Sequence, residues 1–188
     1  EETEPPSDPE QVAHAIALRQ LTLQPRTRAE LAGILRRRGI PDDAAEKVLA
    51  RLEDVRLIDD EAYAHAWVES RHSGRGLARR ALAYELRKRG VDDDIVVDAV
   101  EQLDPDTELE TARALVARRL PSTRRYDTPA RIRRLAGMLA RKGYSSAIAL
   151  RVVREALAEE ARADDEAEHV LEALGAGSDV DDLAALDV

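Results

Sequence analysis

One short pattern, a basic residue followed by glycine and an apolar residue, occurs three times in this chain of 188 residues. It reads Arg38-Gly39-Ile40, then Arg89-Gly90-Val91, then Lys142-Gly143-Tyr144, so the glycines lie 51 and 53 residues apart. Similarity at a fixed period of this length is the signature of tandem structural repeats. We therefore expect three related units in a row rather than one large core.

Each glycine closes a stretch with the periodicity of an amphipathic helix. Leucine stands eight and four positions before every one of these glycines, which places both leucines on one helical face. The leucine pairs are Leu31 and Leu35, Leu82 and Leu86, and Leu135 and Leu139. Cations fill the last turn, where they meet the negative end of the helix dipole, and glycine suits a left-handed cap. This pattern predicts helices near residues 27–38 and 131–142, with a matching helix in the middle unit.

No stretch alternates between apolar and polar residues with the period of two that a half-buried strand requires. The chain has no phenylalanine and few other aromatic residues, so its cores must be built from leucine, isoleucine, valine and alanine. We expect an all-α protein in which three tandem three-helix-bundle repeats form an elongated, curved molecule. The expected parts are a disordered acidic N-terminus at 1–8, repeats at 9–58, 59–104 and 105–160, and an acidic C-terminal tail at 161–188.

The net charge of −9 is unevenly distributed along the chain. Five acids fall in residues 1–10 and nine in residues 164–188, with no lysine or arginine in either segment, so the other 24 acids share the body with all 29 bases. A basic body between acidic ends is typical of proteins that handle nucleic acid or an acidic partner, and such a tail can compete for the basic surface. A tail that only improves solubility explains the same distribution.

Several classes of protein are disfavoured by the composition. The absence of cysteine excludes disulfides, thiolate metal sites and cysteine nucleophiles. The four histidines lack the spacing of metal ligands and are expected to be surface or packed residues; they are His14, His65, His72 and His169. No phosphate-binding loop, membrane-length apolar run or secretion signal is present. We expect a soluble cytoplasmic protein that is not an enzyme and that binds no cofactor or metal.

A basic stripe is predicted on the second helix of each unit. In the middle unit, the side facing away from Leu82 and Leu86 carries three cations and a tyrosine. The other units have fewer cations at these positions, and the connection before the third unit's second helix adds two more. The candidate partner- or DNA-binding residues are Arg36, Arg37, Arg80, Tyr84, Arg87, Lys88, Arg124, Arg125, Arg133 and Arg141. Helix-end electrostatics explain part of this pattern, but a basic face is also the footprint of phosphate or acidic-protein binding.

Two glycines, Gly33 and Gly137, fall on the outward face of these helices. Glycine inside a helix costs about 1 kcal/mol relative to alanine. Either a partner or a neighbouring unit approaches closely there, or these positions tolerate glycine without further consequence.

The middle unit resembles the central signature of the RecX family, bacterial regulators of the recombinase RecA. The resemblance is carried by the segments 57–64 and 85–91 together with Trp67-Val68, Arg71, Gly74 and Gly76. It extends over about residues 11–160, and the segment from Arg131 to Tyr144 is similar to the family's C-terminal repeat, with Met138 where that repeat often carries an aromatic residue.

The resemblance implies a non-enzymatic modulator that lies in the helical groove of the RecA–DNA filament. Such a protein usually inhibits the ATPase, strand-exchange and coprotease activities of RecA, and so acts in homologous recombination, DNA repair and the SOS response. We expect a monomer that contacts the RecA nucleoprotein filament and that can bind single- or double-stranded DNA weakly. A direct DNA-binding protein of the helix-turn-helix kind is the alternative, because three-helix units with a basic last turn also suit that role.

Overall fold

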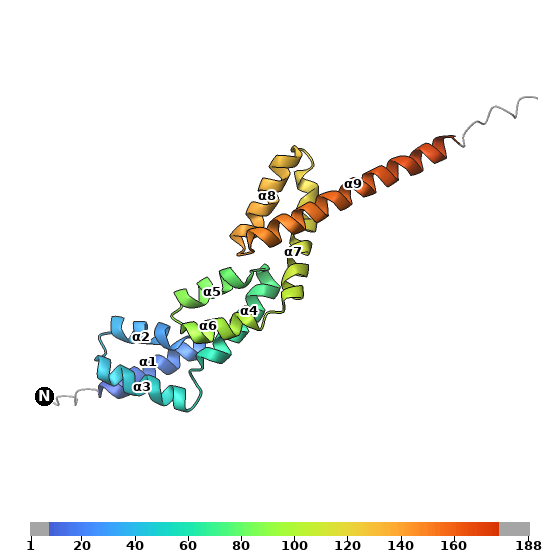
Figure 1. Ribbon diagram of the computed structural model, residues 1–188. Helices are drawn as coiled ribbons and strands as arrows, with labels where there is room; N and C mark the ends of the chain where they lie inside the picture. The colour runs from blue at the N-terminus through green and yellow to red at the C-terminus, as the bar shows by residue number, and fades with distance from the viewer. Residues whose placement is uncertain (1–7, 177–188) are drawn as a thin grey trace, which may run out of the picture.

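The computed structural model describes residues 8–176, and within them it contains nine α-helices, one short 3-10 helix (η1) and no strand. The helices follow one another as three groups of three in an elongated array (Figure 1). The first group is α1 (Pro9–Leu23), α2 (Arg28–Arg37) and α3 (Asp42–Asp54), and the second is α4 (Asp60–Arg75), α5 (Arg79–Lys88) and α6 (Asp93–Glu101). The third is α7 (Pro105–Arg119), η1 (Leu120–Thr123), α8 (Thr128–Arg141) and α9 (Ser146–Ala176). The prediction of an all-α array of three-helix units is confirmed.

Helix boundaries follow from local signals in the sequence. The hydroxyl of Thr27 accepts the backbone N–H of Glu30, whose carboxylate in turn accepts the N–H of Thr27, which completes a capping box at the start of α2. Aspartates accept N–H groups at the starts of four other helices in the same way; they are Asp8, Asp59, Asp104 and Asp127. α8 therefore begins at Thr128, one turn earlier than the start near residue 131 that the periodicity predicts.

Each unit has its own core, centred on the paired leucines of its second helix. Leu31, Leu82 and Leu135, with the leucine four residues after each, have no exposed surface at all. Full burial of one such side chain contributes roughly 1.5–3 kcal/mol. The three cores are separate clusters, so the array is held together by contacts at the two joints between units.

The repeated glycines form those joints. Gly39, Gly90 and Gly143 all have positive φ, between +76° and +91°, which caps the preceding helix. A Cβ atom on Gly90 would overlap the Cβ of Ala29 in the first unit, and one on Gly143 would lie 2.5 Å from the backbone nitrogen of Ala81 in the second. Nothing lies within 4 Å of the same point on Gly39. The second and third glycines therefore have a role that the first lacks, which is to let one unit approach the next.

A carboxylate from each following unit strengthens the joints. Asp60, at the start of α4, accepts the backbone N–H of Arg28 at 2.9 Å, and Glu108, in α7, accepts that of Arg79 at 2.9 Å. Both N–H groups lie in the first turn of a second helix, where they have no partner within the helix. The second and third units thus each cap a helix of the unit before them.

The last helix passes through the repeat boundary expected near residue 160. α9 continues to Ala176, and residues 161–173 are exposed. It leaves the third unit as a single helix that runs away from α7 and α8 (Figure 1). Residues 1–7 and 177–188, on which the rest of the two expected acidic tails falls, lie outside the described part of the chain.

Candidate partner-binding groove

The predicted stripe on α5 lies on the surface. Tyr84 is 67% exposed, and Arg80, Arg87 and Lys88 are exposed beside it, on the side of the helix away from the buried leucines. Arg87 forms an ion pair with Asp93, with 2.6 Å between Nε and Oδ1. Arg80 and Lys88 form no ion pair within residues 8–173. The stripe thus keeps two cations without a carboxylate partner.

A hollow of about 590 Å³ lies where α4, α5 and α8 meet, and we call it the joint hollow. Tyr84 and Lys88 line it together with Arg75 from α4 and Arg141 from α8. Two carboxylates also line it, but both are engaged by other groups: Glu30 pairs with Arg89, and Glu85 accepts the indole N–H of Trp67 at 3.0 Å. Arg89, which also lines the hollow, is thus paired with an acid, whereas Arg75, Lys88 and Arg141 form no ion pair in the part of the chain that the structure describes.

Two guanidinium groups lie over the indole ring of Trp67 in this hollow. Arg71 and Arg89 lie over the ring at 4.0 Å and 3.9 Å from its centroid. Such cation–π contacts contribute about 0.5–1 kcal/mol each at exposed sites. Because Arg89 also pairs with Glu30 of the first unit, this cluster stabilises the joint, and neither arginine is available to a partner in the way that Lys88 is.

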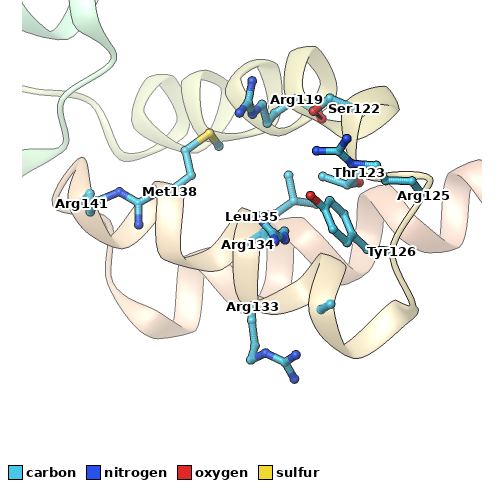
Figure 2. A pocket seen from close by; sticks show the side chains of 11 residues that line it. Arg119, Ser122, Thr123, Arg125, Tyr126, Arg133, Arg134, Leu135, Met138 and Arg141 are labelled. Atoms are coloured by element: carbon cyan, nitrogen blue, oxygen red, sulfur yellow. Dashed lines mark hydrogen bonds between the residues drawn. The ribbon is translucent and has the colours of Figure 1, made fainter.

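A second hollow, of about 960 Å³, lies between α8 and the end of α7, and we call it the arginine hollow (Figure 2). Its lining includes five arginines and no carboxylate; they are Arg119, Arg125, Arg133, Arg134 and Arg141. None of the five takes part in an ion pair within the part of the chain that the structure describes. Several unpaired cations around one hollow produce a strong positive potential, so the arginine hollow is suited to bind an anion.

The floor and the ends of the arginine hollow are apolar or aromatic. Leu135 and Met138 line it from α8, and Tyr126 lies at the end opposite Arg141 (Figure 2). Arg134 lies over the Tyr126 ring at 3.9 Å from its centroid, and Arg125 lies at 4.9 Å. Leu135 is fully buried beneath the hollow, whereas Met138 and Tyr126 are partly exposed. The hollow can therefore accept apolar groups against Met138 and Tyr126 as well as negative charges at its rim.

Arg141 lines both hollows, so they adjoin at this residue and form one surface that runs from α5 along α8. We call this surface the basic groove. It is defined by Arg75, Tyr84, Lys88, Arg119, Arg125, Tyr126, Arg133, Arg134, Leu135, Met138 and Arg141. The groove brings together five of the sequence-predicted residues, namely Tyr84, Lys88, Arg125, Arg133 and Arg141.

The other predicted residues lie elsewhere. Arg36 and Arg37 are exposed on the first unit and line neither hollow, and Arg80 is exposed on α5 outside both linings. Arg124 pairs with Glu160 of α9, with 2.8 Å between Nε and Oε1, and so contributes to the packing of the third unit.

Glu160 is a partly buried acid, with 10% of its side chain exposed, and it pairs with two arginines. Burial opposes its ionisation, but hydrogen bonds from Arg124 and Arg131 outweigh this effect and hold the pKa of the Glu160 carboxyl below its ordinary value. This cluster ties η1 and α8 to α9, and it is therefore structural.

Sequence reasoning missed Arg75, Arg119 and Arg134. Arg134 follows Arg133 directly, and the run of cations from Arg131 to Arg134 was the available signal. Arg119 belongs to α7, and no spacing in the sequence shows that the end of α7 faces α8 across a hollow. Arg119 could therefore be assigned only from the packing of the unit.

One of the four histidines has a packing role in the interior. His72 is buried, and its Nδ1 donates to the carbonyl of Leu77 at 2.9 Å while its Nε2 lies 2.9 Å from the hydroxyl of Thr111. It therefore packs between the second and third units. Within residues 8–176 no group of histidine, aspartate and glutamate side chains is arranged to hold a metal ion, and no helix is long and apolar enough to cross a membrane.

Comparisons with known proteins agree with this architecture. Families defined by the first, second and third three-helix domains of RecX match residues 13–52, 59–100 and 106–153. A protein named Regulatory protein RecX from Streptomyces lividans is 63% identical over 160 residues, which is 85% of each chain. The protein of that name from Mycolicibacterium smegmatis is 47% identical over 164 residues, covering 85% of this chain and 87% of the other.

Solved structures show the same fold. The crystal structure of RecX from Lactobacillus salivarius aligns with a TM-score of 0.74 at 25% identity, covering 79% of this chain and 97% of that one. A crystal structure described as regulatory protein RecX aligns with a TM-score of 0.69 at 26% identity. The three domain matches span most of the chain in order, and the chain belongs to the RecX family.

Proposed function

We propose that this chain is a non-enzymatic modulator, mainly an inhibitor, of the recombinase RecA. In this proposal it binds in the groove of the RecA–DNA filament and suppresses the ATPase, strand-exchange and coprotease activities. Its relatives carry the name Regulatory protein RecX, which supports a regulatory role. The observation that carries the proposal on this chain is the arginine hollow, with its five arginines and no lining carboxylate.

The shape of the array supports binding to a repeating partner. Three linked units can contact several filament subunits at once, and linked weak contacts gain affinity through a high effective concentration. The basic groove then faces the acidic protein surface or the DNA phosphates of the filament. The proposal includes a cytoplasmic location for the protein. No reacting group is required in this mechanism, because occupation of the filament groove alone restrains the subunits.

Charge reversal in the groove tests the proposal. Arg119→Glu with Arg134→Glu reverses two arginines that face the arginine hollow, and it should raise the concentration needed to inhibit RecA ATPase by about tenfold or more, equivalent to about 1.4 kcal/mol or more. The matched control is Arg19→Glu with Arg154→Glu, which makes the same charge change at exposed positions outside the groove. Equal inhibition by the two variants, with helical circular dichroism unchanged, would remove the groove from the proposal.

Direct DNA binding is a second candidate, favoured by one observation. Tyr84 and Tyr126 lie among unpaired cations in the groove, and aromatic rings within a positive groove are typical of single-strand binding surfaces. Binding to bare DNA that falls steeply with salt, together with no affinity for RecA without DNA, would favour this candidate.

A further inference from the structure

Residues 161–173 form the exposed part of α9, which we call the α9 extension. Up to Glu160, one face of α9 packs on α7 and α8 through Ala149, Val152, Val153 and Ala156. At about 100° per residue this face continues in phase along the extension. The residues that continue it are Ala163, Ala167, Val170 and Leu171.

This continued face has no partner within the described part of the chain. Val170 and Leu171 are 58% and 70% exposed, although they lie on the same helical face as the fully buried Val153. Contiguous apolar side chains on a helix face commonly mark an interaction site. The face is therefore a continuation of the core surface that nothing in its own unit covers.

The flanks of the α9 extension are acidic. It carries five acids and one arginine, and the acids are Asp164, Asp165, Glu166, Glu168 and Glu172. No ion pair between residues 8 and 173 involves these five carboxylates. The occupant of this face must therefore present cations around an apolar surface.

The arginine hollow has the complementary properties. Arginines surround the partly exposed Met138 and Tyr126, with no carboxylate in the lining. The α9 extension is about 20 Å long and α8, which forms one wall of the groove, is about 21 Å long, at 1.5 Å per residue. An amphipathic helix that lays its apolar face in such a groove is a common mode of recognition.

We propose that the α9 extension of one copy of this chain binds in the basic groove of a second copy. The extension does not reach the groove of its own chain, because α9 is a single helix that leads away from α8 (Figure 1). The two contacting surfaces differ, so a pair of copies keeps one free groove at one end and one free extension at the other. Further copies can add at these ends, and head-to-tail chains form.

This contact regulates access to the groove. An extension bound in the groove excludes acidic protein surface and DNA phosphates from the same arginines, and a strong polyanion displaces the extension in turn. The monomer expected from the sequence is then the dilute or partner-bound form. Self-association itself needs no other molecule, so its test is independent of the proposed role in RecA regulation, and either proposal can fail alone.

The first test is sedimentation of the full chain at increasing concentration. At low salt the weight-average mass should rise well above the 20.8 kDa of one chain. At about 1 M salt, where the Debye length is about 3 Å, it should return toward that value. Truncation after Glu160 should give one-chain mass under all conditions. A full chain that stays at one-chain mass at every concentration, or association that survives the truncation, overturns the proposal.

Charge reversal identifies the face that binds. Asp164→Lys with Glu166→Lys reverses the charge on both sides of the continued apolar face of the α9 extension and should abolish association. The matched control, Asp165→Lys with Glu172→Lys, makes the same charge change on the opposite side of the helix and should retain most of it. An equal loss of self-association in both variants contradicts binding through the apolar face of the α9 extension.

A mixture of two variants tests the pairing directly. Arg119→Glu with Arg134→Glu in the groove should also prevent association. When this variant is mixed with the Asp164→Lys, Glu166→Lys variant, a lysine-bearing extension meets a glutamate-bearing groove and association should return in part. No gain of mass in the mixture overturns the assignment of the groove as the binding surface.

Discussion

The joint between the second and third units can be broken by one methyl group. In Gly143→Ala the new Cβ would lie 2.5 Å from the backbone nitrogen of Ala81 and 2.7 Å from the Cβ of that residue. Backbone atoms cannot move aside as a flexible side chain can. The third unit must therefore shift away from the second, which also strains the hydrogen bond from the N–H of Ala78 to the carbonyl of Lys142, 2.8 Å long.

Two costs add in this variant. The positive φ of +91° at residue 143 costs a non-glycine residue about 1–2 kcal/mol, and forcing a methyl group into a packed contact costs about 1–3 kcal/mol. Gly143→Ala should therefore reduce the free energy of unfolding by about 2–5 kcal/mol. Gly39→Ala is the matched control, because residue 39 has a φ of +76° but no neighbour within 4 Å of its Cβ position. It should cost only about 1–2 kcal/mol.

Urea unfolding followed by circular dichroism measures the difference between these variants. Because stability in a repeat array depends on the interface between neighbours, Gly143→Ala should also speed amide hydrogen exchange within residues 105–160 more than in the first unit. Equal destabilisation by Gly143→Ala and Gly39→Ala, within about 0.5 kcal/mol, would refute the assignment of this glycine to the joint.

Three further predictions concern the third unit. Gly137→Ala should raise the free energy of unfolding by about 1 kcal/mol, because its Cβ would meet only the end of the Arg141 side chain, at 3.5 Å; a lower urea midpoint would contradict this. The pKa of Glu160 is lower in the folded protein than in the unfolded chain. Its ionised carboxylate therefore stabilises the fold at pH values above the unfolded-state pKa, and this stability is lost as the pH falls through the folded-state pKa. Glu160→Gln should flatten the acid side of the plot of stability against pH. Burial raises the pKa of Tyr144 to about 12, so its contribution to stability is present below pH about 10 and lost as the pH rises toward 12. Burial also raises the pKa of Tyr63, so ultraviolet titration should show late ionisation from both tyrosines, and Tyr144→Phe should reduce it.

Most of the fold could be predicted from the sequence because its signals are local. The capping box at Thr27 and the left-handed glycines each depend on residues within about four positions of one another. The leucine pairs depend on the same helical period. The rise in acids and alanines after Glu160 does not end α9, since both residue types are compatible with a helix.

The candidate site was predicted only in part. Periodicity correctly placed Tyr84 and Lys88 on an outward face, but it could not show that Arg87 pairs with Asp93 or that Arg124 pairs with Glu160. Nor could it bring Arg119 of α7 opposite α8. Helical periodicity predicts that a cation is exposed, but it does not show whether a carboxylate from elsewhere in the fold pairs with it.

What the sequence by itself determined is the number of units, the helices in each and the face that each helix buries. These follow from a 3.6-residue period and from caps that form between near neighbours. Only the tertiary structure decided which cations share a groove, which glycines lie at joints, and where the core face of α9 is left uncovered. The contacts responsible join residues far apart in the chain, such as the hydroxyl of Thr27 and the carbonyl of Arg89, and depend on how the units pack.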